Sequence, residues 1–385
     1  MPKPAFRLPF AVTILLVGAN LRPSLASIGP LLAPIQRDTG LGDTAAGLLT
    51  SLPVLLMGLC LLGTGRLYAA LGGKGGVAAG LAAIGLAGAM RWLWPSGPAL
   101  LASAVAGGVG IAVVQALLPA IIRSRAGSQS AAMMGLYSTA IMGGAAIASF
   151  VAPRIASAHG WAAAAGIWAV PAFAALAIWW STPVATQPRA TPAPAAALSG
   201  HARMWLLLAF FGLGTGAYAL VLAWLPPFYV GLGWSAQDAG GLLGGLTLAE
   251  VAAGTGVALA VAHCHDRRPL ILLAIGALFA GMACLCLAPL SLAWSAAMLC
   301  GLGIGALFPL GLIVALDHGR NAPDAARILG FVQGGGYLLA AVLPLIAGAL
   351  RQHLANLAPA WWLMAALCPA LALMALRLRP GTYLD

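Results

Sequence analysis

The chain of 385 residues is 62% hydrophobic and only 7% charged, with a net charge of +11 and a mean hydropathy of +0.97. Soluble globular domains carry about 25% charged residues, so this composition excludes that class and indicates a membrane protein. The basic residues lie in short segments between hydrophobic runs rather than in one patch, which argues against nucleic-acid binding.

Twelve hydrophobic runs are long enough to cross a bilayer, which takes about 20 helical residues. Six precede a segment rich in Pro, Ala, Thr and Ser, at 9–35, 44–70, 75–94, 97–122, 130–156 and 160–182. Six follow it, at 203–230, 236–262, 269–289, 292–316, 326–350 and 358–378. We therefore expect an all-α membrane protein with an N-terminal six-helix bundle (1–182), a cytoplasmic linker (183–202) and a C-terminal six-helix bundle (203–385).

The distribution of Lys and Arg predicts the orientation in the membrane. With the N-terminus inside, fourteen of the 19 basic residues fall in cytoplasmic segments, and Arg22 falls within the membrane. The remaining four are expected in outer loops: Arg37, Arg91, Arg154 and Arg351. This bias places both termini and the linker in the cytoplasm. The first run is too long for a signal-peptide core and is expected to remain as the first helix.

The two halves look like repeats of each other. Gly40-Leu41 with Ala46-Gly47 recurs 193 residues later as Gly233-Trp234 with Ala239-Gly240. Two six-helix halves with the same orientation indicate parallel repeats about an axis normal to the membrane. Secondary transporters are built in this way and bind their solute between the halves near the bilayer midplane.

The stretch Asn20-Leu21-Arg22-Pro23 sets a permanent cation in the middle of the first run. A guanidinium at that depth costs roughly 2.5 to 3.5 kcal/mol, so Arg22 should face a polar cavity rather than lipid. Gly18 and Ala26 leave room beside it, and Pro23 should bend the helix because it has no amide hydrogen. We predict an anion or polar-solute site with Arg22 and Asn20 as ligands. The alternative is a structural Arg paired with a carboxylate on a neighbouring helix.

Other polar residues lie in the middle of hydrophobic runs. Glu250 is a candidate proton carrier, because a carboxylate away from water favours its neutral form; a structural ion pair is equally compatible. Gln115 lies four residues before Pro119, and Gln333 and Tyr337 share one helix face, so these amides and this phenol are further candidate ligands. For Gln115 the alternative is a hydrogen bond between packed helices.

Tyr137 and Tyr218 are weaker candidates for the same site, since an aromatic residue in a membrane helix more often packs or anchors at the interface. The six cysteines lie in hydrophobic runs with neither a disulfide framework nor a zinc spacing. The stretch His263-Cys264-His265-Asp266 lacks completing ligands, so no metal is expected. There is also no nucleotide motif or catalytic set, so we expect neither a cofactor nor an enzyme.

Gly65-Arg66-Leu67 followed by Gly72-Gly73-Lys74 resembles the cytoplasmic signature of the major facilitator superfamily, although Ala69 replaces its usual acidic residue. This resemblance implies gating roles for Arg66 and Lys74, and for Arg267 and Arg268 in the corresponding loop of the second half.

Nearly the whole chain resembles the cyanate and nitroimidazole permease family, most of all its cyanate branch. The resemblance rests on Asn20-Leu21-Arg22-Pro23, Gly29-Pro30-Leu31-Leu32, Leu52-Pro53, Gly107-Gly108-Val109-Gly110-Ile111, Trp224-Leu225-Pro226, Phe308-Pro309-Leu310-Gly311-Leu312, Asp317-His318 and Gly330-Phe331-Val332-Gln333 with Gly336-Tyr337. It implies transport of a small polar or anionic solute.

The sequence thus predicts a monomeric secondary transporter of the bacterial inner membrane that moves a small anion, cyanate foremost, by alternating access. Transport would be coupled to protons or drawn by consumption of the solute in the cytoplasm. Efflux of nitroimidazoles or drugs is the alternative. Drug efflux is the less favoured because Ala148 and Ser149 replace the closing Gly-Pro of the helix pattern typical of drug antiporters.

Overall fold

The computed structural model describes residues 8–126, 129–183, 201–261, 264, 266–319 and 322–379. All regular elements in these ranges are α-helices. They are α1 (Leu8–Ala19), α2 (Pro23–Ala26), α3 (Ile28–Thr39), α4 (Asp43–Leu62), α5 (Thr64–Leu71), α6 (Gly73–Leu93), α7 (Gly97–Ala126), α8 (Ser130–Gly166), α9 (Ala169–Ser181), α10 (Ala202–Gly231), α11 (Ala236–Ala260), α12 (Arg268–Leu287), α13 (Ala293–Asp317), α14 (Ala322–Ala340), α15 (Val342–Leu354) and α16 (Ala358–Arg377).

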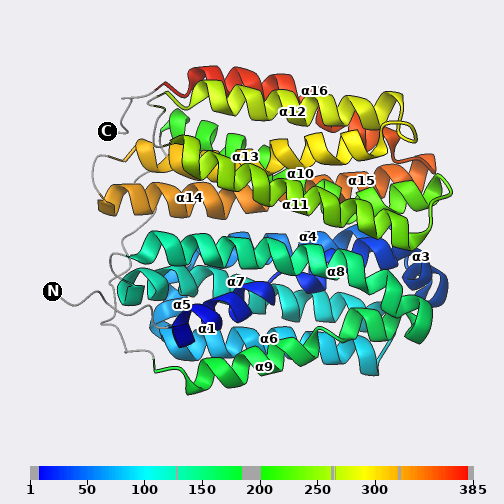
Figure 1. Cartoon of the computed structure of the whole chain (residues 1–385), viewed down its shortest axis with the longest axis horizontal. Coiled ribbons are helices and arrows are strands. Elements are labelled where there is room, and N and C mark those ends of the chain that lie inside the picture. Colours follow the sequence, from blue (N-terminus) through cyan, green and yellow to red (C-terminus); the bar gives the residue numbers. More distant parts are fainter. Residues whose placement is uncertain are drawn as a thin grey trace.

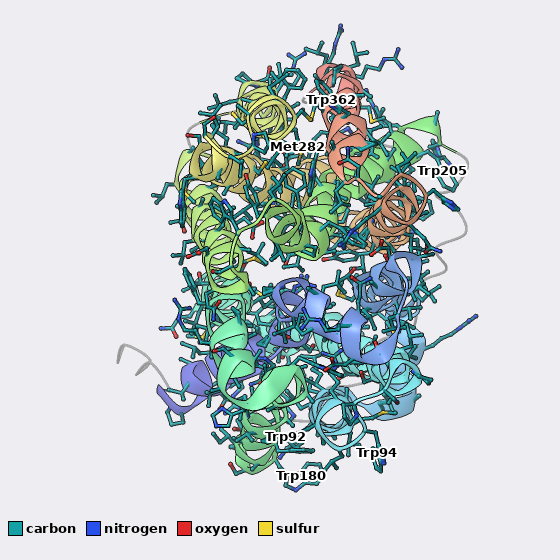
Figure 2. All side chains as sticks on the ribbon, turned by 90° about the vertical axis from the view of Figure 1, so that its right-hand side faces the viewer. Trp92, Trp94, Trp180, Trp205, Met282 and Trp362 are labelled. Atoms are coloured by element: carbon teal, nitrogen blue, oxygen red, sulfur yellow. The ribbon has the colours of Figure 1, made fainter. Side chains whose placement is uncertain are left out.

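The helices form two layers, with α1 to α9 in one and α10 to α16 in the other (Figure 1). Helix α1 begins and helix α16 ends at the same end of the bundle, here named the terminal end, and the opposite end is named the far end (Figure 1). Figure 2, viewed from the far end, places Trp92, Trp94, Trp180, Trp205 and Trp362 on the perimeter, and each is exposed. Exposed tryptophans around a helical bundle are typical of a surface that meets lipid. The assignment of the two layers as separate domains stays a prediction.

Eleven helical stretches of the described residues are long and apolar enough to span a membrane, and one of them covers 50 residues. That stretch would be about 75 Å long as one helix, more than twice the bilayer core of about 30 Å. Gly160 interrupts it at φ 80°. Trp161 donates to Asp38 at the far end, and Trp179 donates to the Lys74 carbonyl at the terminal end. The stretch therefore crosses twice, and the predicted twelve crossings are confirmed for the described residues.

The first crossing is interrupted where Arg22 lies. Helix α1 ends at Ala19 and α2 begins at Pro23, so the predicted bend is confirmed. The Ala19 carbonyl lies against Gly144 of α8, where an added Cβ would come within 2.1 Å of that oxygen. The chain therefore needs glycine at position 144 for α8 to approach the interruption this closely.

Arg91 supports the same segment from α6. We expected this residue in an outer loop, which is wrong: it lies in the last turn of α6 and is only 2% exposed. Its Nη1 donates to the Ser24 carbonyl over 2.7 Å, and its Nε donates to Ser103 Oγ over 2.9 Å. The acceptor of the first bond, the Ser24 carbonyl, lies in the protein interior beside the interruption of the first crossing. A hydrophobicity pattern does not reveal such an acceptor, so it could not place Arg91 correctly.

The two layers are joined at the far end. Arg351 of α15 forms an ion pair with Asp43 at the start of α4, with 3.3 Å between Nη1 and Oδ1. Next to it, Thr44 donates to the Gln352 side-chain oxygen over 2.6 Å. The packing is close, because a Cβ added at Gly348 would lie 2.7 Å from the Asp43 carbonyl oxygen. The structure is therefore closed between α4 and α15 at this end.

Replacing Arg91 with Met should lower the unfolding temperature of the purified protein, because it removes two hydrogen bonds that a charged group donates, each worth about 1.5 to 3 kcal/mol. Arg37→Met, at an exposed position, is the matched control. Equal unfolding temperatures for both variants would show that Arg91 does not hold α2 in place.

Replacing Arg351 with Gln should loosen the far end. This ion pair is partly exposed, at 26% and 20% of the two side chains, and should contribute roughly 1 kcal/mol, so the open population should rise by about fivefold. Hydrogen–deuterium exchange measured by mass spectrometry should therefore be faster in peptides that cover the start of α4 and the end of α15. Exchange as slow as that of an Arg37→Gln control would show that the ion pair does not contribute to closure.

Candidate solute-binding site

Arg22 is buried between the two layers and is 4% exposed. Its Nη1 lies 3.6 Å from Sδ of Met57 on α4, and its guanidinium carbon lies 5.5 Å from the ring centroid of Tyr218 on α10. The Nε has no hydrogen-bond partner within the protein, and none of the ion pairs in the described ranges includes Arg22. The alternative of a structural Arg in direct contact with a carboxylate therefore has no support in the described residues.

Side chains from both layers interact with this guanidinium. Tyr137 of α8, Tyr218 of α10, Glu250 of α11 and Tyr337 of α14 all lie close enough to Arg22 to interact with it electrostatically. These four residues together with Arg22 are here named the Arg22 cluster. Three of its members belong to the second layer, so the cluster spans the boundary between the layers.

Several buried polar atoms of the cluster have no hydrogen-bond partner within the protein. They are the hydroxyl oxygens of Tyr137 and Tyr218 and both carboxyl oxygens of Glu250. Thr215 Oγ1, one helical turn from Tyr218 on α10, is also buried and has no hydrogen-bond partner. More than about 90% of buried polar groups in proteins are hydrogen-bonded, so this concentration of unsatisfied donors and acceptors is unusual. Such a set can bind a small polar solute.

Two glycines set the positions of cluster members. A Cβ at Gly18 would lie 3.2 Å from the Tyr137 ring, so this ring uses the room that we had expected beside Arg22. A Cβ at Gly305 of α13 would lie 2.4 Å from the Cα of Glu250, so the two helices touch at this level. The main chain that carries Glu250 is therefore held firmly against α13.

Three of the predicted ligands take no part in the described contacts of Arg22. Asn20 donates to the Leu16 carbonyl of its own helix over 2.8 Å. Gln115 lies on α7 with a buried, unpartnered Oε1, and Gln333 is half-buried on α14 one turn before Tyr337. A common cavity for Arg22 and Gln333 stays a prediction.

Met57 and Thr215 are contacts or neighbours of the cluster that we did not predict. Thr215 could have been found, because it lies three residues before Tyr218 and so on the same helix face. Met57 gives no such signal, since a methionine in a hydrophobic run looks like any packing residue.

The loops with expected gating roles differ between the two halves. In the second half, Arg267 pairs with Asp317 over 3.4 Å and Arg268 pairs with Asp266 over 2.7 Å. Hydrogen bonds from Arg268 hold the pKa of Asp266 below its usual range. The second-half loop is thus held by ion pairs.

In the first half, Arg66 is exposed on α5, and the Lys74 amine lies 6.0 Å from the Trp180 ring centroid. Neither forms an ion pair with the described carboxylates, in agreement with the missing acidic residue at Ala69. His263 and His265 of the proposed but disfavoured metal motif lie outside the described residues.

Comparison with known proteins places this arrangement in context. Residues 14–326 match the family model described as Major Facilitator Superfamily. The chain is 37% identical over 376 residues to the cyanate transport protein CynX of Escherichia coli (strain K12), with 97% of each chain covered. It is 31% identical over 362 residues to the 2-nitroimidazole transporter of the same organism, covering 91% of this chain and 90% of that relative.

Solved structures agree on the fold. The chain is similar to the D-xylose-proton symporter with a TM-score of 0.80 at 16% identity, covering 98% of this chain and 99% of that one. It is similar to the nucleoside transporter NupG with a TM-score of 0.75 at 14% identity, covering 96% and 98% of the two chains. The protein therefore belongs to the Major Facilitator Superfamily and, within it, to the cyanate and nitroimidazole permease family indicated by its motifs.

Proposed function

We propose that this protein moves cyanate, a small monovalent anion, across the bacterial inner membrane by alternating access, with both of its own termini in the cytoplasm. The observation that carries the proposal is Arg22: a buried guanidinium outside every described ion pair, in a cluster where the hydroxyls of Tyr137 and Tyr218 are unpartnered. A buried cation is costly unless an anion or polar groups compensate it, and a bound anion would do so. The relationship to a protein named for cyanate transport supports the choice of solute.

The chemistry of cyanate suits this cluster. The ion is short and linear, and its charge is shared between oxygen and nitrogen, so each end can accept hydrogen bonds. The guanidinium presents several donors in one plane, and phenol hydroxyls add single donors from other directions. Arg22, Tyr137, Tyr218 and Tyr337 can therefore surround a small anion without any other charged ligand.

The distribution of the cluster over both layers supports alternating access. Any rocking of one layer against the other changes the distances from Arg22 to Tyr218, Glu250 and Tyr337. The contacts of Asp43 and Thr44 with α15 close the far end in this conformation. We propose that they separate when the solute is exchanged at that end, while Arg267 and Arg268 remain held by their ion pairs in the opposite loop.

Proton coupling would overcome an electrical barrier. The free energy of a monovalent anion rises by about 2.3 kcal/mol per 100 mV when it enters a cell with a negative interior, which opposes uptake by about fortyfold. One proton carried with each anion makes the step electroneutral. Glu250 is buried, has unpartnered oxygens and interacts with both Arg22 and Tyr218, so we propose it as the proton carrier.

Export of nitroimidazoles is the second candidate. Three tyrosines gather near Arg22, and Phe211 packs edge-on against the Tyr337 ring with 5.7 Å between centroids. Aromatic surroundings suit a flat ring, and the oxygens of a nitro group can accept hydrogen bonds from a guanidinium. Similarity to a relative named 2-nitroimidazole transporter also supports this second candidate. Supplying both solutes to the same proteoliposomes distinguishes the two proposals.

Replacing Arg22 with Lys should reduce cyanate transport in proteoliposomes by about 10- to 100-fold, because one charged hydrogen bond contributes roughly 1.5 to 3 kcal/mol. The variant should keep its elution volume in size-exclusion chromatography and an unfolding temperature near that of the wild type. Arg37→Lys, at an exposed position, should transport normally. Unchanged cyanate transport by a folded Arg22→Lys variant would remove Arg22 from the site.

Replacing Glu250 with Gln keeps the shape of the side chain but prevents it from carrying a proton. With an imposed pH gradient, the variant should still exchange labelled for unlabelled cyanate but should no longer accumulate it. Accumulation that survives in Glu250→Gln would make Glu250 structural. A wild type that ignores the pH gradient would instead support uptake driven by consumption of the solute.

A further inference from the structure

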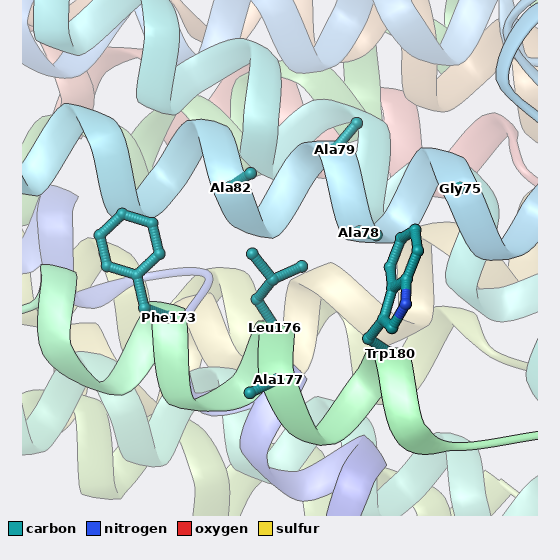
Figure 3. A pocket seen from close by; sticks show the side chains of 8 residues that line it. All are labelled: Gly75, Ala78, Ala79, Ala82, Phe173, Leu176, Ala177 and Trp180. Carbon is teal, nitrogen blue, oxygen red and sulfur yellow. The ribbon is translucent and has the colours of Figure 1, made fainter.

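A groove separate from the Arg22 cluster runs between α6 and α9 on the outer side of the first layer. Its volume is about 780 Å³. Small residues of α6 form its floor, and larger side chains of α9 flank it (Figure 3). The lining residues are Gly75, Ala78, Ala79, Ala82, Phe173, Leu176, Ala177 and Trp180. None of them carries a charge, so the groove suits a hydrocarbon ligand.

The groove occupies the depth of a single leaflet. It begins at Gly75, near the terminal end, and reaches Ala82, which is about 10 Å further along α6. Half of a bilayer core is about 15 Å thick, so the deep end stops short of the midplane. Ala79 and Trp180 are exposed, so the groove opens sideways toward lipid.

A positive charge lies at the mouth of the groove. The Lys74 amine is 6.0 Å from the ring centroid of Trp180, a residue of the lining. The neighbouring Trp179 donates its indole hydrogen to the Lys74 carbonyl over 3.0 Å, which holds the lysine backbone against α9. Lys74 forms no ion pair with a described carboxylate. Helix α6 also begins here without a side-chain cap, so the free N–H groups of its first turn add to the positive potential.

We propose that this groove binds one anionic phospholipid from the leaflet at the terminal end. An acyl chain lies between α6 and α9 over the small residues, with the Trp180 ring beside it. The phosphate of the headgroup lies at the Lys74 amine. The uncharged lining, and a lysine that forms no ion pair with the described carboxylates, thus match the two parts of one amphipathic ligand.

Native mass spectrometry of the purified protein tests this with phosphatidylglycerol and phosphatidylcholine of identical acyl chains. The wild type should bind phosphatidylglycerol about fivefold more tightly, the effect expected of one basic residue near a membrane surface. Lys74→Gln should lose this preference while still binding both lipids. Ala79→Trp should weaken the binding of both, because the indole fills the groove.

Two matched controls separate the site from general effects. Arg123→Gln removes a different exposed charge at the terminal end, and Ala174→Trp adds an indole to an exposed position of α9 outside the lining. Both should bind lipid like the wild type. An unchanged lipid preference in Lys74→Gln, or wild-type binding by Ala79→Trp, would overturn the proposal. Competition by inorganic phosphate as effective as that by phosphatidylglycerol would also overturn it, since the ligand would then be an ion and not a lipid.

Discussion

A permanent cation in the interior of a membrane protein must be compensated, and much of the first layer is arranged around that requirement. Arg22 lies where the first crossing is interrupted, between α1 and α2. The interruption leaves main-chain groups without their helical partners, which membrane proteins tolerate only where the interior satisfies them. Arg91 satisfies the Ser24 carbonyl, and Gly144 lets α8 approach the Ala19 carbonyl. Neighbours within the same layer thus accommodate the interruption.

The second layer supplies the rest of the surroundings of Arg22. Tyr218, Glu250 and Tyr337 come from three different helices, so no single helix of that layer determines the site. This division links the electrostatics of the site to the relative position of the layers. A solute that binds to groups of both layers can favour one arrangement over another only through different contacts in each. The closed far end, with Asp43 against Arg351, is one such arrangement.

Much of the fold could be predicted from the sequence, because hydrophobic runs of spanning length report membrane crossings directly. Pro23 also predicted the interruption of the first helix correctly. The convergence of Tyr137, Tyr218 and Tyr337 could only be suggested, since each is one aromatic residue in a hydrophobic run and its neighbours depend on helix packing. Arg91 was misplaced because its acceptor, the Ser24 carbonyl, comes within reach of the side chain only in the folded protein. The groove beside Lys74 could not be predicted from the sequence, because alanine and glycine in a membrane helix usually indicate close contact between helices.

The central claim is that Arg22 binds the transported anion directly. Selenocyanate is a linear anion related to cyanate, and its selenium atom scatters anomalously, so it can be located in crystals of the transporter. The account predicts an anomalous peak between the Arg22 guanidinium and the Tyr218 and Tyr337 rings, and its loss in crystals of the Arg22→Lys variant. A peak at another place in the protein, or an unchanged peak in that variant, would contradict it.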